Sequence, residues 1–108
     1  SQVVRQIEQS YADSDLSPTR IADSLGMSSA YLGRIFREST QISISQYLNQ
    51  TRIRRAEELL RETEQPVETV AGLVGFSNPK YFYVVFKNIT GQTPLQFRKA
   101  VHSASEIN

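Results

Sequence analysis

Residues 43–62 read SISQYLNQTRIRRAEELLRE, and this stretch decides the fold of the chain. Ser43 and Gln46 have the spacing of a reciprocal capping box, so a helix is predicted to begin there. Apolar residues then recur mostly at three- and four-residue steps, without an intervening Gly or Pro. About 20 residues at 1.5 Å each form a rod of roughly 30 Å. Similar sequence flanks this rod on both sides, so we interpret it as a connector between two copies of one small module.

The segment before the connector has the pattern of two short helices around a tight turn. Ser17 and Pro18 form a helix start, with a capping hydroxyl followed by Pro at the first helical position. Gly26 ends this helix, and Ser28 caps the next one. We expect this next helix to bury Leu32, Ile35 and Phe36. The pattern is that of a helix-turn-helix motif, preceded by a short amphipathic helix.

The same pattern returns after the connector. Gly75 stands in the second copy where Gly26 stands in the first, and Tyr81 corresponds to Tyr31. The offset between the copies grows by one residue at the turn, where Asn78 takes the place of the capping serine and a proline follows it. The chain therefore contains an internal repeat.

These patterns predict an all-α fold of about seven helices, with two helix-turn-helix subdomains joined by a long central helix. We expect an N-terminal helix and the first helix-turn-helix in residues 1–42, and the connector helix in residues 43–63. The second helix-turn-helix and a final helix should occupy residues 64–101, followed by a polar tail in residues 102–108.

Composition argues against several classes of protein. Cysteine is absent and His102 is the only histidine, so thiolate, zinc and nucleophile–base chemistry have almost no candidate residues. We therefore expect no enzymatic activity and no cofactor or metal. The chain shows no secretory pattern and no apolar run long enough to cross a membrane, which favours a cytoplasmic protein without a membrane partner. The net charge of +1 argues against binding by phosphate attraction alone.

Two helix-turn-helix units on a rod of this length indicate double-stranded DNA as the partner, since successive major grooves lie about 34 Å apart. Arg34 is the strongest candidate for reading bases, because a guanidinium can bond guanine O6 and N7 together. The base-reading candidates are Ser29, Ala30, Gly33, Arg34, Pro79, Lys80, Tyr83 and Val84. The phosphate-contact candidates are Ser17, Arg37, Arg52, Lys87 and Arg98. The second unit has fewer donors, so we expect it to contribute positioning more than discrimination.

The chain also resembles the DNA-binding domain of AraC/XylS-type bacterial transcription regulators. The most specific part of the likeness comprises Gly75-Phe76, Tyr81-Phe82, Val85-Phe86-Lys87, Gly91, Thr93-Pro94 and Phe97-Arg98. The resemblance implies seven helices, two recognition helices in successive major grooves, and control of transcription at promoters. It places the base-reading positions on Ala30, Gly33 and Arg34, and on Pro79, Lys80, Tyr83 and Val84.

The resemblance further implies RNA polymerase as a partner, and a sensing or receiver domain outside this chain. The chain looks closest to members attached to a response-regulator receiver, although sugar-responsive members look much alike, and the family also contains small self-standing activators. A helical protein-interaction module of a larger signalling protein is the alternative function. Salt dependence separates the two, because phosphate contacts release counterions.

Overall fold

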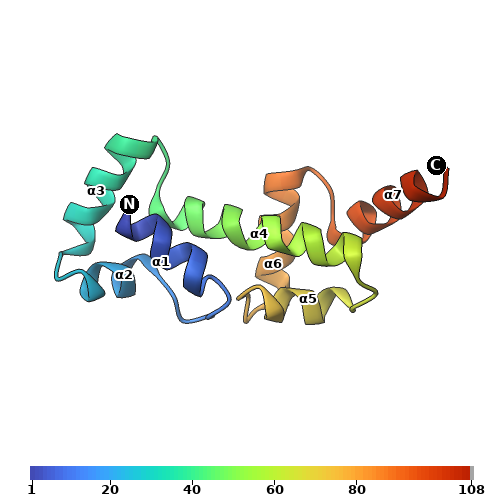
Figure 1. The fold of residues 1–108 in the computed structure, drawn as a ribbon, viewed down its shortest axis with the longest axis horizontal. Helices are drawn as coiled ribbons and strands as arrows, with labels where there is room; N and C mark the ends of the chain where they lie inside the picture. The colour runs from blue at the N-terminus through green and yellow to red at the C-terminus, as the bar shows by residue number, and fades with distance from the viewer. Residues whose placement is uncertain (108) are drawn as a thin grey trace.

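The structure is a computed structural model in which residues 1–107 are described, with side chains described as far as residue 104. It confirms the all-α fold with two helix-turn-helix motifs, in an elongated molecule of 50 × 24 × 21 Å (Figure 1). In the described part of the chain the helices are α1 (Gln2–Ser10), α2 (Pro18–Ser24), α3 (Ser29–Thr40), α4 (Ile44–Glu62), α5 (Val67–Leu73), α6 (Pro79–Thr90) and α7 (Pro94–Ile107). Across residues 1–107, none of these helices has the length and apolarity that a membrane crossing requires.

Helix α4 is shared by the two halves of the molecule. The predicted capping box is present, with Gln46 N donating to Ser43 Oγ at 3.0 Å and Ser43 N donating to Gln46 Oε1 at 2.8 Å. The first turns of α4 contribute Ile44 and Leu48 to a core formed with α1, α2 and α3. Its later turns contribute to a second core, formed with α5, α6 and α7. One 19-residue helix is therefore part of both units, because its first turns pack in the first core and its later turns pack in the second.

The two turns form as their residues predict. Gly26 (φ +68°) follows α2, and Gly75 (φ +104°) follows α5. The next helices begin at Ser28, whose Oγ accepts from Tyr31 N, and at Asn78, whose Oδ1 accepts from Lys80 N. Positive φ is costly for residues that carry a side chain, so glycine allows the chain to reverse direction without strain at both turns.

Two expectations about the helices are wrong. Ile35 is 38% exposed, because Leu32 and Phe36 already fill the contact of α3 with the core and Ile35 lies beside that line. The tail does not begin at His102 as expected, since α7 continues to Ile107; the last position of the expected tail, 108, lies outside the described residues. No Gly or Pro interrupts the sequence after Pro94, so nothing local ends the helix earlier.

Arg52 joins the two halves near the middle of α4. Its Nε donates to the carbonyl oxygen of Tyr11 at 2.8 Å, and one terminal nitrogen donates to the carbonyl oxygen of Asp13 at 2.9 Å. Its guanidinium lies 5.6 Å from the centre of the Phe76 ring in the second unit. Burial lowers the pKa of the Arg52 guanidinium, and the Asp13 carboxylate partly opposes the shift. The loop after α1 is thus tied to both the rod and the second helix-turn-helix.

Gly75 allows this junction to close. A Cβ at Gly75 would overlap the Tyr11 carbonyl oxygen and would lie 2.7 Å from Arg52 Nε. Gly91 also has a positive φ, of +82°, but a Cβ there would meet nothing within 4 Å. A substitution at Gly91 therefore costs only backbone strain, whereas a substitution at Gly75 also blocks the contact between Tyr11 and Arg52.

We expect Gly75→Ala to lower the free energy of unfolding by roughly 3–5 kcal/mol, because it adds the loss of charged hydrogen bonds to the strain of positive φ. Gly91→Ala should cost about 1–2 kcal/mol, from strain alone. Urea denaturation of the two variants measures both values. Equal losses would show that Arg52 and Tyr11 do not need the open space at Gly75.

Candidate nucleic-acid interface

Helix α3 gathers the first set of predicted base-reading residues on one exposed face. Ser29, Ala30 and Arg34 are exposed, and Gly33 is half-buried beside them. The Arg34 guanidinium lies 5.5 Å from the centre of the Tyr31 ring, which supports it without using its hydrogen-bond donors. On this face, the first turn of α3 thus carries small side chains, and the guanidinium of Arg34 follows one turn later.

Helix α6 presents the second set, with different chemistry. Pro79, Lys80 and Val84 are exposed, and Val84 has 56% of its surface open. Tyr83 is half-buried and packs against the second core, with its ring 6.2 Å from that of Phe82. Lys80 is therefore the one cation in the first turn of α6, beside an apolar side chain of suitable size for a methyl group.

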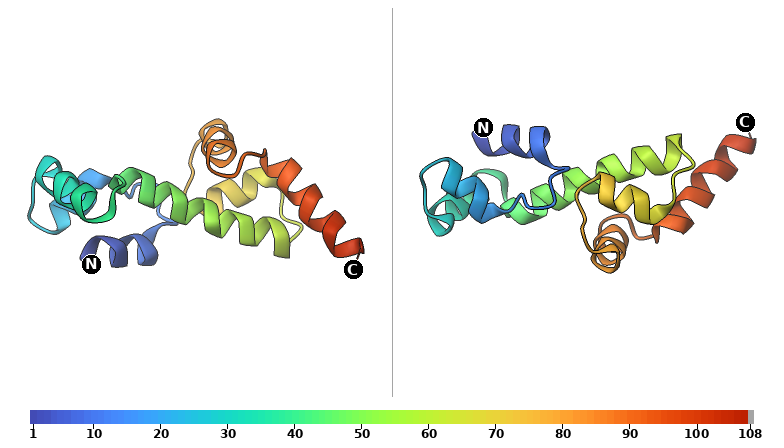
Figure 2. Two further views of the ribbon diagram at one scale, coloured as in Figure 1. Left: turned by 90° about the horizontal axis from the view of Figure 1, so that it is seen from above. Right: turned by 90° about the horizontal axis from the view of Figure 1, so that it is seen from below.

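The two helices have the same direction in space. In Figure 1 both α3 and α6 ascend from their turns at the lower edge of the molecule. Figure 2 shows α6 on the side of α4 opposite α1 in both views. The rod thus holds two helix-turn-helix units in similar orientations.

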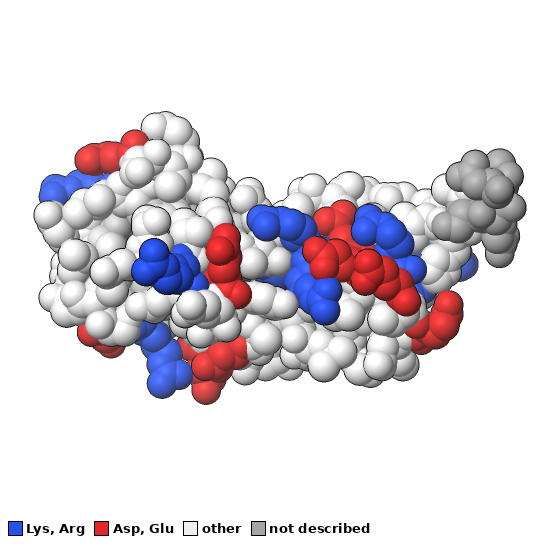
Figure 3. All heavy atoms as spheres, viewed as in Figure 1, with Lys and Arg blue, Asp and Glu red and all other residues white. Residues whose placement is uncertain are grey.

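The side of α4 that faces away from α6 carries mixed charges. Figure 3 shows basic and acidic side chains intermingled over the second half of the rod. Arg55 and Glu58 form an ion pair there at 2.7 Å, and this hydrogen bond raises the pKa of the Arg55 guanidinium. Neighbouring charges of opposite sign cancel at a distance, so this surface offers little attraction to a polyanion.

Two of the five phosphate candidates bind backbone carbonyls of this chain in the structure. Arg52 is buried, with 6% of its surface exposed, and its donors bind the carbonyl oxygens of Tyr11 and Asp13. Arg98 is half-buried, and donates to the carbonyl oxygens of Leu60 at 3.1 Å and Thr63 at 3.2 Å. It holds the C-terminal end of α4 against α7, satisfying carbonyls that a helix end leaves free. Both arginines therefore have structural roles.

The other phosphate candidates stay predictions. Arg37 and Lys87 are exposed in the last turns of α3 and α6. Ser17 is half-buried and caps α2, its Oγ accepting from Arg20 N at 3.2 Å. These three residues lie in equivalent or adjoining parts of the helix-turn-helix units.

Sequence reasoning missed the junction at Arg52, although a signal for it was present. Arg52 lies four residues after Leu48 and four residues before Ala56, and both of these are buried. A charged residue in phase with an apolar stripe points into the core, where it needs hydrogen-bond partners. The phase of the residue, rather than its charge, indicated its role.

Comparison with known proteins agrees with this arrangement. A family model described as a helix-turn-helix domain matches residues 21–100. The chain is 37% identical over 100 residues to the Msm operon regulatory protein of Streptococcus mutans, covering 93% of this chain and 36% of that protein. It is 36% identical over 92 residues to the arabinose operon regulatory protein of Escherichia coli, covering 85% of this chain and 32% of that protein. The chain thus spans about a third of the length of these relatives.

Solved structures show the same fold. The C-terminal domain of the two-component response regulator yesN from Fusobacterium nucleatum has a TM-score of 0.86 at 35% identity, covering 89% of this chain and 93% of that one. The DNA-binding domain of AdpA, solved with a target DNA, has a TM-score of 0.87 at 26% identity, covering 94% and 91%. The fold and the two exposed helices define a DNA-binding domain for transcription regulation. The chain belongs to the AraC-type helix-turn-helix family.

We expect Arg52→Lys to lower the free energy of unfolding by roughly 2–4 kcal/mol, because one ammonium cannot reproduce the guanidinium fork between two carbonyls. Arg37→Ala removes an exposed side chain and should change stability by less than about 0.5 kcal/mol. Urea denaturation measures both effects.

The salt dependence of binding to a long non-specific duplex distinguishes a phosphate contact at Arg37 from a structural role of Arg52. We expect Arg37→Ala to reduce the slope of log affinity against log salt by about 1, and Arg52→Lys to leave it unchanged. The reverse pattern would make Arg52 a phosphate contact after all.

Proposed function

We propose that α3 and α6 insert into successive major grooves on one face of double-stranded DNA and read bases there. The observation that carries this proposal is the placement of two similarly directed helices along one continuous helix. The 19 residues of α4 span roughly 28 Å at 1.5 Å each, close to the groove repeat of about 34 Å. The likeness to the AdpA DNA-binding domain, solved with a target DNA, supports DNA as the partner of this fold.

The two units make unequal contributions in this proposal. Arg34 bonds a guanine edge through two donors, while Ala30 and Gly33 allow the backbone of α3 to approach the base pairs. In the second unit Lys80 binds guanine or phosphate, and Val84 contacts a thymine methyl group. Ser29, Pro79 and Tyr83 complete the reading surfaces. The first unit supplies most of the discrimination, and the second supplies mainly position.

The proposal also covers the domain that controls this one, its protein partner and its place in the cell. Two similar solved structures are C-terminal domains of response regulators, from Fusobacterium nucleatum and Geobacillus stearothermophilus. We infer that a sensing or receiver domain controls this domain, that it acts with RNA polymerase at promoters, and that it works in the bacterial cytoplasm, where the chromosome lies.

The experiment that tests this function is selection of bound duplexes from a random DNA pool by the purified domain. The proposal expects two short preferred blocks, separated by about one helical turn. A pool without enrichment would overturn sequence-specific binding by the isolated domain.

We expect Arg34→Ala to weaken binding to the selected duplex by about 1–3 kcal/mol and to relax preference at one base position. Arg37→Ala is the matched control, since it should weaken binding to all sequences alike. Competition assays with duplexes altered at single base pairs measure the difference. A uniform loss from Arg34→Ala would make Arg34 a phosphate contact.

Spacing between the two preferred blocks tests the rod. Inserting about 5 bp moves one block to the opposite face of the duplex, and inserting about 10 bp adds roughly 34 Å. A continuous α4 cannot follow either change, so both insertions should reduce affinity toward that of a single unit. Titration of the three duplexes at one salt concentration measures this; equal affinities would show that the units act independently.

A further inference from the structure

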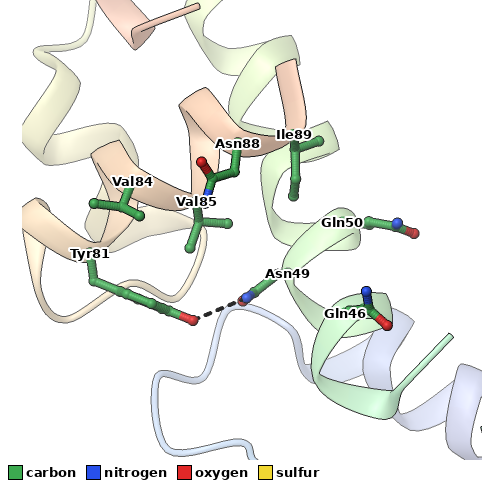
Figure 4. Close-up of a pocket in the computed structure, with 8 residues that line it drawn as sticks. All are labelled: Gln46, Asn49, Gln50, Tyr81, Val84, Val85, Asn88 and Ile89. Carbon is green, nitrogen blue, oxygen red and sulfur yellow. Dashed lines mark hydrogen bonds between the residues drawn. The ribbon is translucent and has the colours of Figure 1, made fainter. Parts of the chain in front are cut away.

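A groove of about 390 Å³ lies between the first half of α4 and α6 (Figure 4). Four carboxamide side chains line it: Gln46, Asn49, Gln50 and Asn88. Val84 and Ile89 add apolar surface, being 56% and 44% exposed. Among the described residues, none of those lining the groove carries a formal charge. The groove thus combines neutral hydrogen-bond donors with small apolar side chains.

Two of these amides are already fixed by the protein. Asn49 Nδ2 donates to the Tyr81 hydroxyl at 3.2 Å, which ties α4 to α6 across the groove. Gln46 Oε1 accepts from Ser43 N in the capping box, which leaves the amide nitrogen of Gln46 as a donor. Gln50 lies one turn after Gln46, and Asn88 lies one turn after Val84; both are exposed. The groove therefore has a fixed frame with exposed amides on both walls.

The position of the groove indicates what it faces. Val84 belongs both to the groove and to the proposed reading face of α6. The other wall is the part of α4 that leads to the first helix-turn-helix, on the rod that α1 covers from the opposite side. The groove thus lies beside the proposed reading face of α6, on the part of α4 that continues toward the first helix-turn-helix. On a duplex read in two successive major grooves, the intervening element is a minor groove bordered by sugar-phosphate backbone.

We propose that this groove binds the sugar-phosphate backbone of the DNA strand that passes between the two major grooves. The Gln50 and Asn88 amides donate to phosphate oxygens, and Val84 and Ile89 contact the deoxyribose. Such contacts fix the register of a protein on DNA without reading sequence. Because the donors are neutral, they stabilise the complex without releasing an additional counterion. The inference rests on the proposed mode of DNA binding and adds a third contact region to it.

The test uses Gln50→Ala and Asn88→Ala, with Gln9→Ala as the control. Gln9 is an exposed carboxamide on α1, on the other side of the rod. Each groove variant should bind the selected duplex roughly tenfold more weakly, the loss of one hydrogen bond to a charged acceptor. Base preference and the salt slope should stay as in the wild type, and Gln9→Ala should bind within about twofold of it. Wild-type affinity in both groove variants would overturn the inference.

Single methylphosphonate substitutions locate the contact. At one or two positions in the backbone between the preferred blocks, the neutral linkage should weaken the wild-type domain but not Gln50→Ala or Asn88→Ala. Equal sensitivity of the wild type and both variants at every position would overturn the inference. Sequence selection together with the Arg34→Ala effect remains in that case, so the proposed function survives separately. Absence of any specific duplex for the wild type overturns both.

Discussion

The arrangement of the two units depends on the two hydrogen bonds that the Arg52 guanidinium donates to backbone carbonyl oxygens. Helix α4 connects the units, and the carbonyl oxygen of Tyr11, in the loop after α1, lies close to Gly75 in the second turn. Arg52 adds to this contact by binding Tyr11 and Asp13 while lying over Phe76. The Tyr11 side chain packs against both cores. A buried cation is costly unless its donors are satisfied, so this contact specifies one geometry.

A second arginine secures the other end of the rod. Arg98 binds the last carbonyls of α4, so α7 fixes the point at which the rod ends. The two arginines, together with the Asn49–Tyr81 bond, hold α4 to the chain on either side at its start, centre and end. The exposed helices α3 and α6 are therefore presented by a frame whose main polar contacts are internal. The exposed faces of the two helices can differ in chemistry, because Arg34, Lys80 and Val84 take no part in these polar contacts.

The sequence was sufficient for the local structure, because caps, glycines and apolar spacing act over a few residues. Ser43, Asn78 and Gly75 each have the predicted role. Long-range packing was harder to predict: charge suggested a surface role for Arg52 and Arg98, whereas both bind carbonyls of residues distant in sequence. Ile35 is apolar yet lies outside the core, because contact area on α3 is limited to the line through Leu32 and Phe36. The placement of the predicted reading residues follows from helix phase, while the groove between α4 and α6 depends on how the helices pack.

The common direction of α3 and α6 has a consequence for the shape of the target. A twofold-symmetric dimer reads a palindrome, because its recognition helices run in opposite senses. Here the two units repeat along the rod in a similar orientation, so in the proposed mode of binding one domain matches a tandem site without a dyad. Since α3 and α6 also carry different side chains, the two halves of that site differ in sequence. In that mode a single bound domain has a polarity along the duplex, with the α3 unit at one end of the site and the α6 unit at the other.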